Sequence, residues 1–214
     1  ELLLDTPQFF TVFWNSCGQV FPIILGHVLL GAPAAWAFAK FHFRGKKILY
    51  TLYIVLMLMP FQVTMVSSYL VLNKLGLIDT VWAVILPGAV STLPVFIMTR
   101  FFMDIPEAVM EAAAVDGASS FQTFLRFGLP LGAPGILSAV VLGFLEYWNA
   151  IEAPQAFLKN QALWPLSLYM SNITADNAGV SLIASLITLM PPLLIFLSGQ
   201  KYLEQGIISS GMKD

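Results

Sequence analysis

The sequence predicts an all-α membrane protein, a polytopic bundle of hydrophobic helices. Apolar residues make up 58% of the 214 residues and charged residues only 10%, whereas roughly a quarter of the residues in an ordinary soluble domain are charged. The mean hydropathy is +0.81, so a soluble fold would have too few polar side chains to cover its surface. The apolar runs are long and show no period-two alternation, which excludes strands as the spanning elements.

Five apolar stretches are long enough to cross a hydrocarbon core, which needs about 20 residues. They are Gln19–Phe38, Ile48–Leu72, Val81–Phe102, Leu131–Ile151 and Ser181–Leu203. We expect residues 1–214 to form a single transmembrane domain. The first residue is Glu1 rather than methionine, so we expect further sequence upstream.

The positive charges predict the orientation of these spans. Eight of the ten lysines and arginines fall on one side of the alternating spans: Lys40, Arg44, Lys46, Lys47, Arg100, Arg126, Lys201 and Lys213. Only Lys74 and Lys159 fall on the other side. Because cytoplasmic loops carry the excess of positive charge, we expect residues 104–130 and the C-terminus in the cytoplasm. The N-terminal end and the Ala153–Val180 loop are then outside.

Several spans carry residues that make poor lipid-facing surface. Gly31, Ala35 and Ala39 form a small-residue stripe that lets another helix approach closely. Prolines and polar residues are expected to interrupt three later spans, at Pro60 with Thr64, Ser67 and Ser68, at Pro87, Gly88, Ser91, Thr92 and Pro94, and at Pro191 and Pro192. Irregular backbone at membrane depth is tolerated against protein or a water-filled cavity. Such spans are typical of a moving pathway, and kinks kept for packing alone are the alternative.

The polar segment 104–130 predicts two short helices that meet at a glycine. Asp104 is expected to cap a helix that runs to Val115 and ends at Asp116-Gly117, with Gly117 left-handed. Ser119 and Gln122 form a capping box that opens a second helix through about Phe127. The resulting knob would present a small, smooth surface at Ala112–Ala114 and aromatic faces at Phe121, Phe124 and Phe127. An amphipathic loop lying on the membrane surface is the alternative.

The same segment resembles the "EAA" loop of binding-protein-dependent ABC importers. The resemblance lies in Glu111-Ala112-Ala113, Asp116-Gly117-Ala118 and Leu129-Pro130. In that family the loop couples the permease to the ATP-hydrolysing subunit, in whose cleft it docks. The resemblance therefore assigns coupling to Glu111, Ala112, Ala113, Asp116, Gly117, Ala118, Phe121 and Pro130.

The resemblance extends over nearly the whole chain and points to the carbohydrate branch of these permeases. It includes residues 34–46, the turn 75–80, Phe144 with Trp148-Asn149, and the tail 200–213. The chain is most similar to the smaller permease subunit of maltose-type importers, which has six spans, so one span is expected upstream. Trp36 stands where the family usually carries Tyr, and Glu146 is not a residue that we associate with the family.

The resemblance implies a mechanism. A solute-binding protein outside the bacterial cell membrane delivers a sugar to a heterodimer of this chain and a second permease subunit. Two ATP-binding cassette subunits, which bind ATP and Mg, drive transport through the coupling loops. This chain is expected to bind no cofactor and to be no enzyme, because Gly45-Lys46 is followed by Lys47 and no phosphate-binding loop is present. Its partners include lipid but no nucleic acid, since the sequence has no suitable basic cluster.

The candidate substrate pathway combines polar and aromatic residues of two spans: Glu146, Tyr147, Trp148 and Asn149, with Thr64, Ser67 and Ser68. Ala139, Gly143, Glu146 and Asn149 share one helix face, and a carboxylate on that face is costly against lipid. We therefore expect Glu146 to face a wet cavity or the partner permease. Pairing of Glu146 with a basic residue of the partner, for assembly alone, is the alternative.

Three other functions are alternatives. A permease for a polyol or a sugar phosphate would show the same sequence features. An ion-coupled secondary transporter would need buried acidic residues in several spans, and here only Glu146 and Glu152 lie within or near one. An intramembrane enzyme would need a nucleophile or a metal set, and the sequence shows neither.

Overall fold

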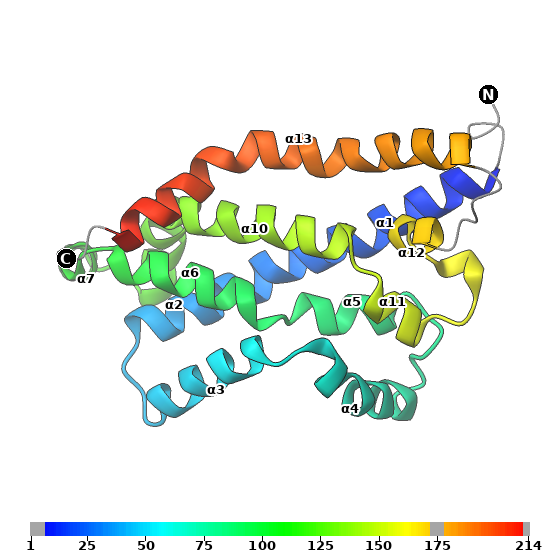
Figure 1. The fold of residues 1–214 in the computed structure, drawn as a ribbon. Coiled ribbons are helices and arrows are strands. Elements are labelled where there is room, and N and C mark those ends of the chain that lie inside the picture. The colour runs from blue at the N-terminus through cyan, green and yellow to red at the C-terminus, as the bar shows by residue number, and fades with distance from the viewer. Residues whose placement is uncertain (1–6, 172–177, 212–214) are drawn as a thin grey trace. The chain divides into compact units, whose positions relative to one another are not determined.

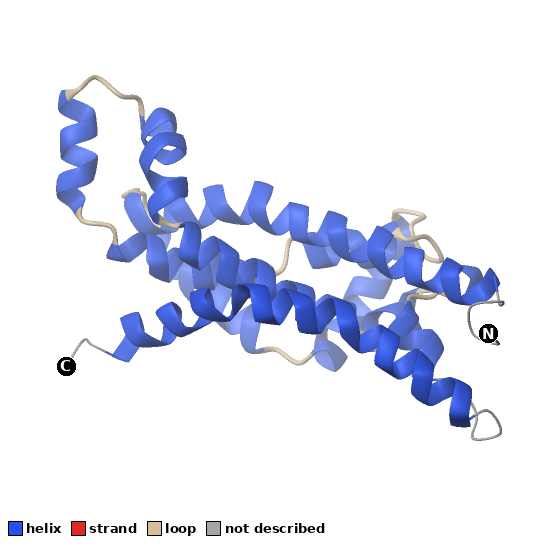
Figure 2. Cartoon of the chain, turned by 90° about the horizontal axis from the view of Figure 1, so that it is seen from above, coloured by secondary structure: helices blue, strands red, loops and turns tan. Residues whose placement is uncertain are grey.

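The computed structural model describes residues 7–171 and 178–211, and every regular element among them is a helix (Figures 1 and 2). This confirms the all-α prediction. The α-helices are α1 (Pro7–Gly26), α2 (Ala32–Lys40), α3 (Lys46–Leu58), α4 (Phe61–Lys74), α5 (Trp82–Ala89), α6 (Thr92–Asp104), α7 (Glu107–Val115), α8 (Ser120–Thr123), α9 (Leu129–Leu131), α10 (Ala133–Trp148), α11 (Glu152–Phe157), α12 (Leu166–Ser171) and α13 (Ala178–Gly211). Two π-helical segments, η1 (His27–Gly31) and η2 (Phe124–Gly128), and the 3-10 helix η3 (Gln161–Leu163) complete the set.

Three helical stretches are long and apolar enough to cross a membrane: Phe9–Lys40, Trp82–Asp104 and Ala184–Glu204. The number rises to five if two interrupted pairs, Lys46–Leu58 with Phe61–Lys74 and Ser120–Leu131 with Ala133–Trp148, each count as one span. These stretches coincide with the five predicted from the sequence. The first span begins earlier than predicted, because Asn15 and Ser16 lie inside α1 instead of ahead of it.

Two spans are interrupted as predicted, but only the first break lies at a proline, because Pro87 lies inside α5 and Pro94 lies inside α6. Pro60 lies between α3 and α4 in an extended conformation, with φ −65° and ψ 146°. The third span is broken between α5 and α6, where Ser91 adopts a similar extended conformation with φ −55° and ψ 145°. Pro60 cannot donate a backbone N–H, so it ends one helix and begins the next.

The predicted interruption at Pro191 and Pro192 is wrong, because α13 continues through both residues. The proline ring fixes φ near the helical value, so the cost is a missing N–H donor. In a regular helix, the N–H of residue 192 would donate to the carbonyl of Thr188, but proline has no N–H. That carbonyl instead accepts a hydrogen bond of 3.1 Å from Trp148 Nε1. The indole thus satisfies a carbonyl that proline leaves without its helical partner.

The chain forms two compact units. Unit 1 comprises residues 1–25, 59–89 and 143–197, and unit 2 comprises residues 26–58, 90–142 and 198–214. Lys213 lies outside the described residues, and the other seven lysines and arginines that were assigned to the cytoplasmic side belong to unit 2. Lys74 and Lys159 belong to unit 1. The division of the fold therefore follows the division of charge, and the orientation itself stays a prediction.

In unit 2, α2 packs along α6 (Figure 1). The small-residue stripe lies in this contact: a Cβ on Gly31 would come within 2.9 Å of the Met98 side chain, and Ala35 is fully buried. The core of the unit is aromatic. Trp36 contacts Phe102 edge-on with ring centroids 5.2 Å apart, and Phe124 with centroids 5.6 Å apart.

Unit 1 contains three smaller apolar clusters. One joins α1, α10, α12 and α13 around Trp148 and Leu166. The second joins α1, α5 and the loop after α11 around Ile23 and Leu158. The third joins α4, α5 and α11 around Phe157.

Candidate functional site

The predicted knob is present in unit 2 as α7 followed by α8 and η2. Helix α7 ends where Gly117 adopts a left-handed conformation, with φ +78°. The N–H of Ala118 donates to the carbonyl of Ala113 at 2.9 Å, and the N–H of Gly117 donates to that of Ala114 at 3.0 Å. This pair of bonds is the Schellman motif, which satisfies carbonyls at a helix C-terminus and favours glycine at its left-handed position.

The second helix opens with the predicted capping box. The N–H of Gln122 donates to Ser119 Oγ at 3.3 Å, and the N–H of Ser119 donates to Gln122 Oε1 at 2.9 Å. Only Gly117 and Ala118 lie between Asp116, the C-cap of α7, and Ser119, the N-cap of α8. The turn is thus fixed by local hydrogen bonds on both sides.

Three details of the knob differ from the prediction. Asp104 does not cap α7, because it is the last residue of α6, and Pro106 is the N-cap of α7. The second helix does not stop near Phe127 but continues through η2 and α9 to Leu131. Phe124 presents no surface, since it is only 7% exposed and packs against Trp36.

Most of the residues assigned to coupling are accessible. Glu111, Ala112, Asp116, Gly117 and Pro130 are exposed, Phe121 is 67% exposed, Ala118 is half-buried and Ala113 is buried. Val115, which the sequence analysis did not select, is 86% exposed at the end of α7. Two exposed apolar side chains, Val115 and Phe121, therefore flank the Gly117 turn. Their position beside a glycine turn was the signal available in the sequence.

The candidate pathway residues of the fourth span lie at the end of α10 in two different environments. Glu146 and Asn149 are exposed, and Asn149 Nδ2 donates to the carbonyl of Leu145 at 2.8 Å. Trp148 is 2% exposed and stacks on Phe144 with centroids 5.3 Å apart. Tyr147 is half-buried and belongs to the apolar clusters of unit 1. The structure thus presents polar groups on one face of α10 and packs the aromatic rings inside.

The helix face that was expected to line the pathway changes character along α10. Ala139, in unit 2, is 1% exposed, and Gly143 at the edge of unit 1 is buried. Glu146 and Asn149, which follow at helical spacing on the same face, are exposed. Only the last two of these four residues are therefore accessible in the described chain.

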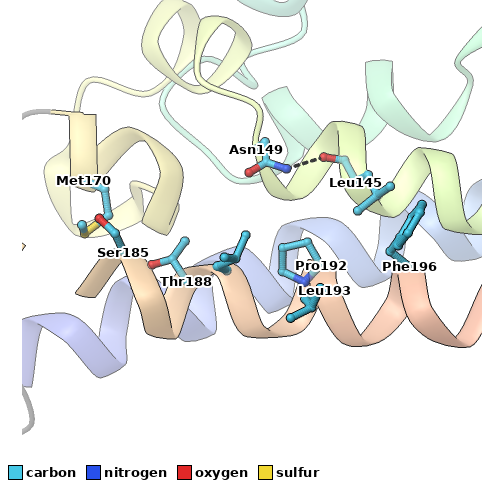
Figure 3. Close-up of a pocket in the computed structure, with 9 residues that line it drawn as sticks. Leu145, Asn149, Met170, Ser185, Thr188, Pro192, Leu193 and Phe196 are labelled. Carbon is cyan, nitrogen blue, oxygen red and sulfur yellow. Dashed lines mark hydrogen bonds between the residues drawn. The ribbon is translucent and has the colours of Figure 1, made fainter. Parts of the chain in front are cut away.

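An open pocket of about 410 Å³ lies beside Asn149 in unit 1 (Figure 3). Helix α13 supplies most of its wall, and the polar groups that point into it come from Asn149, Ser185 and Thr188. Apolar surface completes the lining, contributed by Leu145, Met170, Leu189, Pro192, Leu193 and Phe196. Asn149 was predicted from the sequence, whereas Ser185 and Thr188, which lie three residues apart on one face of an apolar helix, were not.

The other pathway candidates, Thr64, Ser67 and Ser68, lie on α4, which packs against α11. Ser67 is exposed, while Thr64 and Ser68 are half-buried. Gln62, five residues before Ser67 on α4, donates from Nε2 to Glu152 Oε1 at 2.5 Å. The candidate residues therefore form two groups on separate helices, and Glu152 is engaged with the α4 group.

A loop of unit 1 is held by polar residues from two other segments, and these residues were not selected from the sequence. Asp79 Oδ1 accepts hydrogen bonds from the N–H groups of Lys159 (2.8 Å) and Asn160 (2.7 Å). From α1, Asn15 Nδ2 donates to the carbonyl of Ala162 at 2.7 Å, and Gln19 Nε2 donates to that of Leu163 at 2.9 Å. Asn15 and Gln19 are one helical turn apart in α1, and this spacing of two amide side chains in an apolar helix could have identified them from the sequence.

Among the residues that the structure describes, no three His, Cys, Asp or Glu side chains are grouped so that they could hold a metal ion. The polar side chains that line the pocket of unit 1 carry one amide and two hydroxyl groups. Such groups bind hydroxylated solutes through hydrogen bonds. The features that stand out are thus a rigid helical knob in unit 2 and a polar-lined pocket in unit 1.

Comparison with solved structures identifies the architecture. A crystal structure of a bacterial ABC transporter involved in the import of the acidic polysaccharide alginate matches with a TM-score of 0.81 and 21% identity, over 94% of this chain and 77% of that chain. A second crystal structure, of a bacterial alginate ABC transporter in complex with an alginate pentasaccharide-bound periplasmic protein, matches with a TM-score of 0.70 and 18% identity, over 92% of this chain and 79% of that chain. At these identities the likeness establishes the fold.

Sequence comparison identifies the family. The arabinooligosaccharides transport system permease protein AraQ of Halalkalibacterium halodurans is 26% identical over 215 aligned residues, which cover 99% of this chain and 77% of the relative. A family model described as "binding-protein-dependent transport system inner membrane component" matches residues 27–209. This match includes the whole knob and the pocket. The chain therefore belongs to the family of inner membrane components of binding-protein-dependent transport systems.

Proposed function

We propose that this chain is a permease subunit of an ATP-driven importer and that it passes a sugar or oligosaccharide into the cytoplasm. The observation that carries the proposal is the family match over residues 27–209. The sugar assignment is supported by AraQ, whose name refers to arabinooligosaccharides, and by the two alginate transporter structures. The complex with a periplasmic protein supports delivery of the solute by a binding protein.

The knob of residues 107–128 is the coupling element in this proposal. It is rigid because a Schellman motif and a capping box fix its turn. It is suited to a protein cleft because Val115 and Phe121 are exposed beside the turn. Separate ATP-binding subunits move the knob when they close on ATP, and the permease then opens to the opposite side. The division of positive charge between the units supports a cytoplasmic knob and a cytoplasmic C-terminus.

The solute path on this chain runs along the exposed face of α10 in unit 1. Asn149 contributes an amide to the pocket there, and Ser185 and Thr188 contribute hydroxyl groups from α13. A sugar has apolar faces and hydroxyl edges, so a pocket with apolar walls and a few polar groups suits it. Glu146 lies on the same face, where it contacts either the solute or a basic residue of the second permease subunit.

The test is purification of the tagged chain from native membranes with its bound partners, followed by reconstitution in proteoliposomes. We expect an ATP-binding subunit and a second permease in stoichiometric amounts, and ATP-dependent uptake of a labelled oligosaccharide such as arabinotriose or an alginate trisaccharide. Uptake of a labelled polyol alone would replace the sugar assignment. Uptake driven by an ion gradient without an ATP-binding subunit would contradict the proposal.

A further inference from the structure

Helix α2 contacts both ends of the knob through two residues one helical turn apart, Trp36 and Lys40. Residues four apart lie on the same face of a helix, so both side chains extend from one edge of α2. Trp36 is 3% exposed and Lys40 is half-buried. Both residues and the whole knob belong to unit 2.

Lys40 holds the entry to the knob. Its Nζ donates a hydrogen bond to the backbone carbonyl of Ile105. Ile105 is the C-cap of α6 and lies immediately before Pro106, the N-cap of α7. The ammonium group thus fixes the junction at which the chain leaves α6 and enters the knob.

Trp36 holds the exit from the knob. Its six-membered ring lies so close to Gly128 that a Cβ there would be 2.8 Å from the ring carbon Cζ3. The ring cannot swing away easily, because it is packed edge-on against Phe102 and tilted against Phe124. Gly128 is the last residue of η2, so the indole bears directly on the backbone where the knob rejoins the membrane part.

We propose that Trp36 and Lys40 form a clamp through which movement of the knob is transmitted to α2. The knob is continuous in sequence with α6 and, through α9, with α10, and Phe124 also packs against Phe102 of α6. The clamp adds α2, to which the knob is not joined directly in sequence. Both residues are positioning residues, since neither contacts solute or nucleotide in this account. The inference rests on the proposed coupling role of the knob and extends it to named contacts in the body of the permease.

The clamp is tested with size and charge variants in the intact complex. Gly128→Ala places a methyl group against the Trp36 ring, and Trp36→Leu removes that ring. The double variant Trp36→Leu with Gly128→Ala restores contact at the same point. Lys40→Met removes the hydrogen bond to Ile105 and keeps an unbranched side chain, so it tests the clamp without disturbing a packed ring.

Each variant has a matched control. Trp14→Leu alters a tryptophan that is 67% exposed. Lys47→Met alters an exposed lysine. Gly18→Ala adds a methyl group to a helical glycine that has no atom within 4 Å of its Cβ position.

The readout is the response of unit 1 to nucleotide, measured without any solute. Cys17 is replaced by serine, a single cysteine replaces Asn149, and its reactivity toward a water-soluble maleimide is compared with and without a non-hydrolysable ATP analogue. We expect a nucleotide-dependent change in the parent and in the controls, and its loss in Gly128→Ala, Trp36→Leu and Lys40→Met. Basal ATP hydrolysis persists in all of them, and the double variant regains the response.

Three results would overturn parts of this account, and they are distinguishable. If the clamp variants respond normally while Gly117→Val does not, the knob couples but the clamp does not transmit. If the double variant fails to recover although both single variants are defective, contact between positions 36 and 128 is not the cause. If Gly117→Val also responds normally, or the parent shows no response, the proposed coupling function itself fails.

Discussion

Replacement of Gly117 gives a defined perturbation of the knob. Gly117 has a φ of +78°, and no atom lies within 4 Å of the position that a Cβ would occupy. The cost of a side chain there comes from the backbone conformation alone, about 1–2 kcal/mol for an L-residue in the left-handed region. A change of this size lowers the population of the native turn by roughly 5- to 30-fold. Gly117→Asn should be the mildest replacement, because asparagine tolerates this conformation, and Gly117→Val the most severe.

Gly76 provides the matched control. It has a φ of +68°, lies in the same kind of helix C-cap at the end of α4, and also has an open Cβ position. Gly76→Val therefore carries a similar backbone cost in unit 1. In proteoliposomes with the loaded binding protein, we expect Gly117→Val to lose stimulated ATP hydrolysis and transport while the complex still assembles. Gly76→Val should keep the ratio of transport to hydrolysis. Stimulated transport at the parent level in Gly117→Val, or equal uncoupling by Gly76→Val, would refute the reasoning.

Three further predictions concern orientation, the pathway and the α10–α13 contact. A cysteine at Ser120 should react only with reagents that reach the cytoplasm and one at Gln161 only with reagents outside intact cells; reversed labelling would overturn the orientation. Glu146→Gln and Asn149→Ala should leave assembly and ATP hydrolysis intact and alter the transport rate or solute preference, whereas normal transport in both, or loss of the heterodimer, would remove this face from the pathway. Trp148→Phe should destabilise the complex to heat by about 1–3 kcal/mol, since the part-buried carbonyl of Thr188 in α13 loses its donor, and an unchanged thermal midpoint would show that another group satisfies it.

The sequence predicted the knob well because its signals are local. The left-handed Gly117 and the capping box of Ser119 and Gln122 depend only on residues within one turn. The misplaced cap at Asp104 also has a local reason. Proline disfavours the helical conformation of the residue before it, and Ile105 is accordingly extended, with φ −69° and ψ 123°. Helix α6 therefore ends there, and Asp104 belongs to α6.

The remaining errors arise from contacts between distant segments. Phe124 follows the helical period of an exposed aromatic, but its burial is decided by Trp36 and Phe102. The continuity of α13 through its two prolines depends in part on the hydrogen bond from the Trp148 indole of α10 to the carbonyl of Thr188. The contact between α2 and the entry to the knob likewise depends on a hydrogen bond from Lys40 to the backbone carbonyl of Ile105. A backbone carbonyl leaves no pattern in the sequence that would identify it as a partner.

The central claim is that the knob docks into an ATP-binding subunit, and photo-cross-linking tests it most directly. A benzophenone side chain is placed at Phe121, which is 67% exposed beside the Gly117 turn, and the complex is irradiated in native membranes. The account predicts one major adduct with the ATP-binding subunit, which weakens when Gly117→Val is added. Adducts confined to lipid or to the second permease subunit would contradict it.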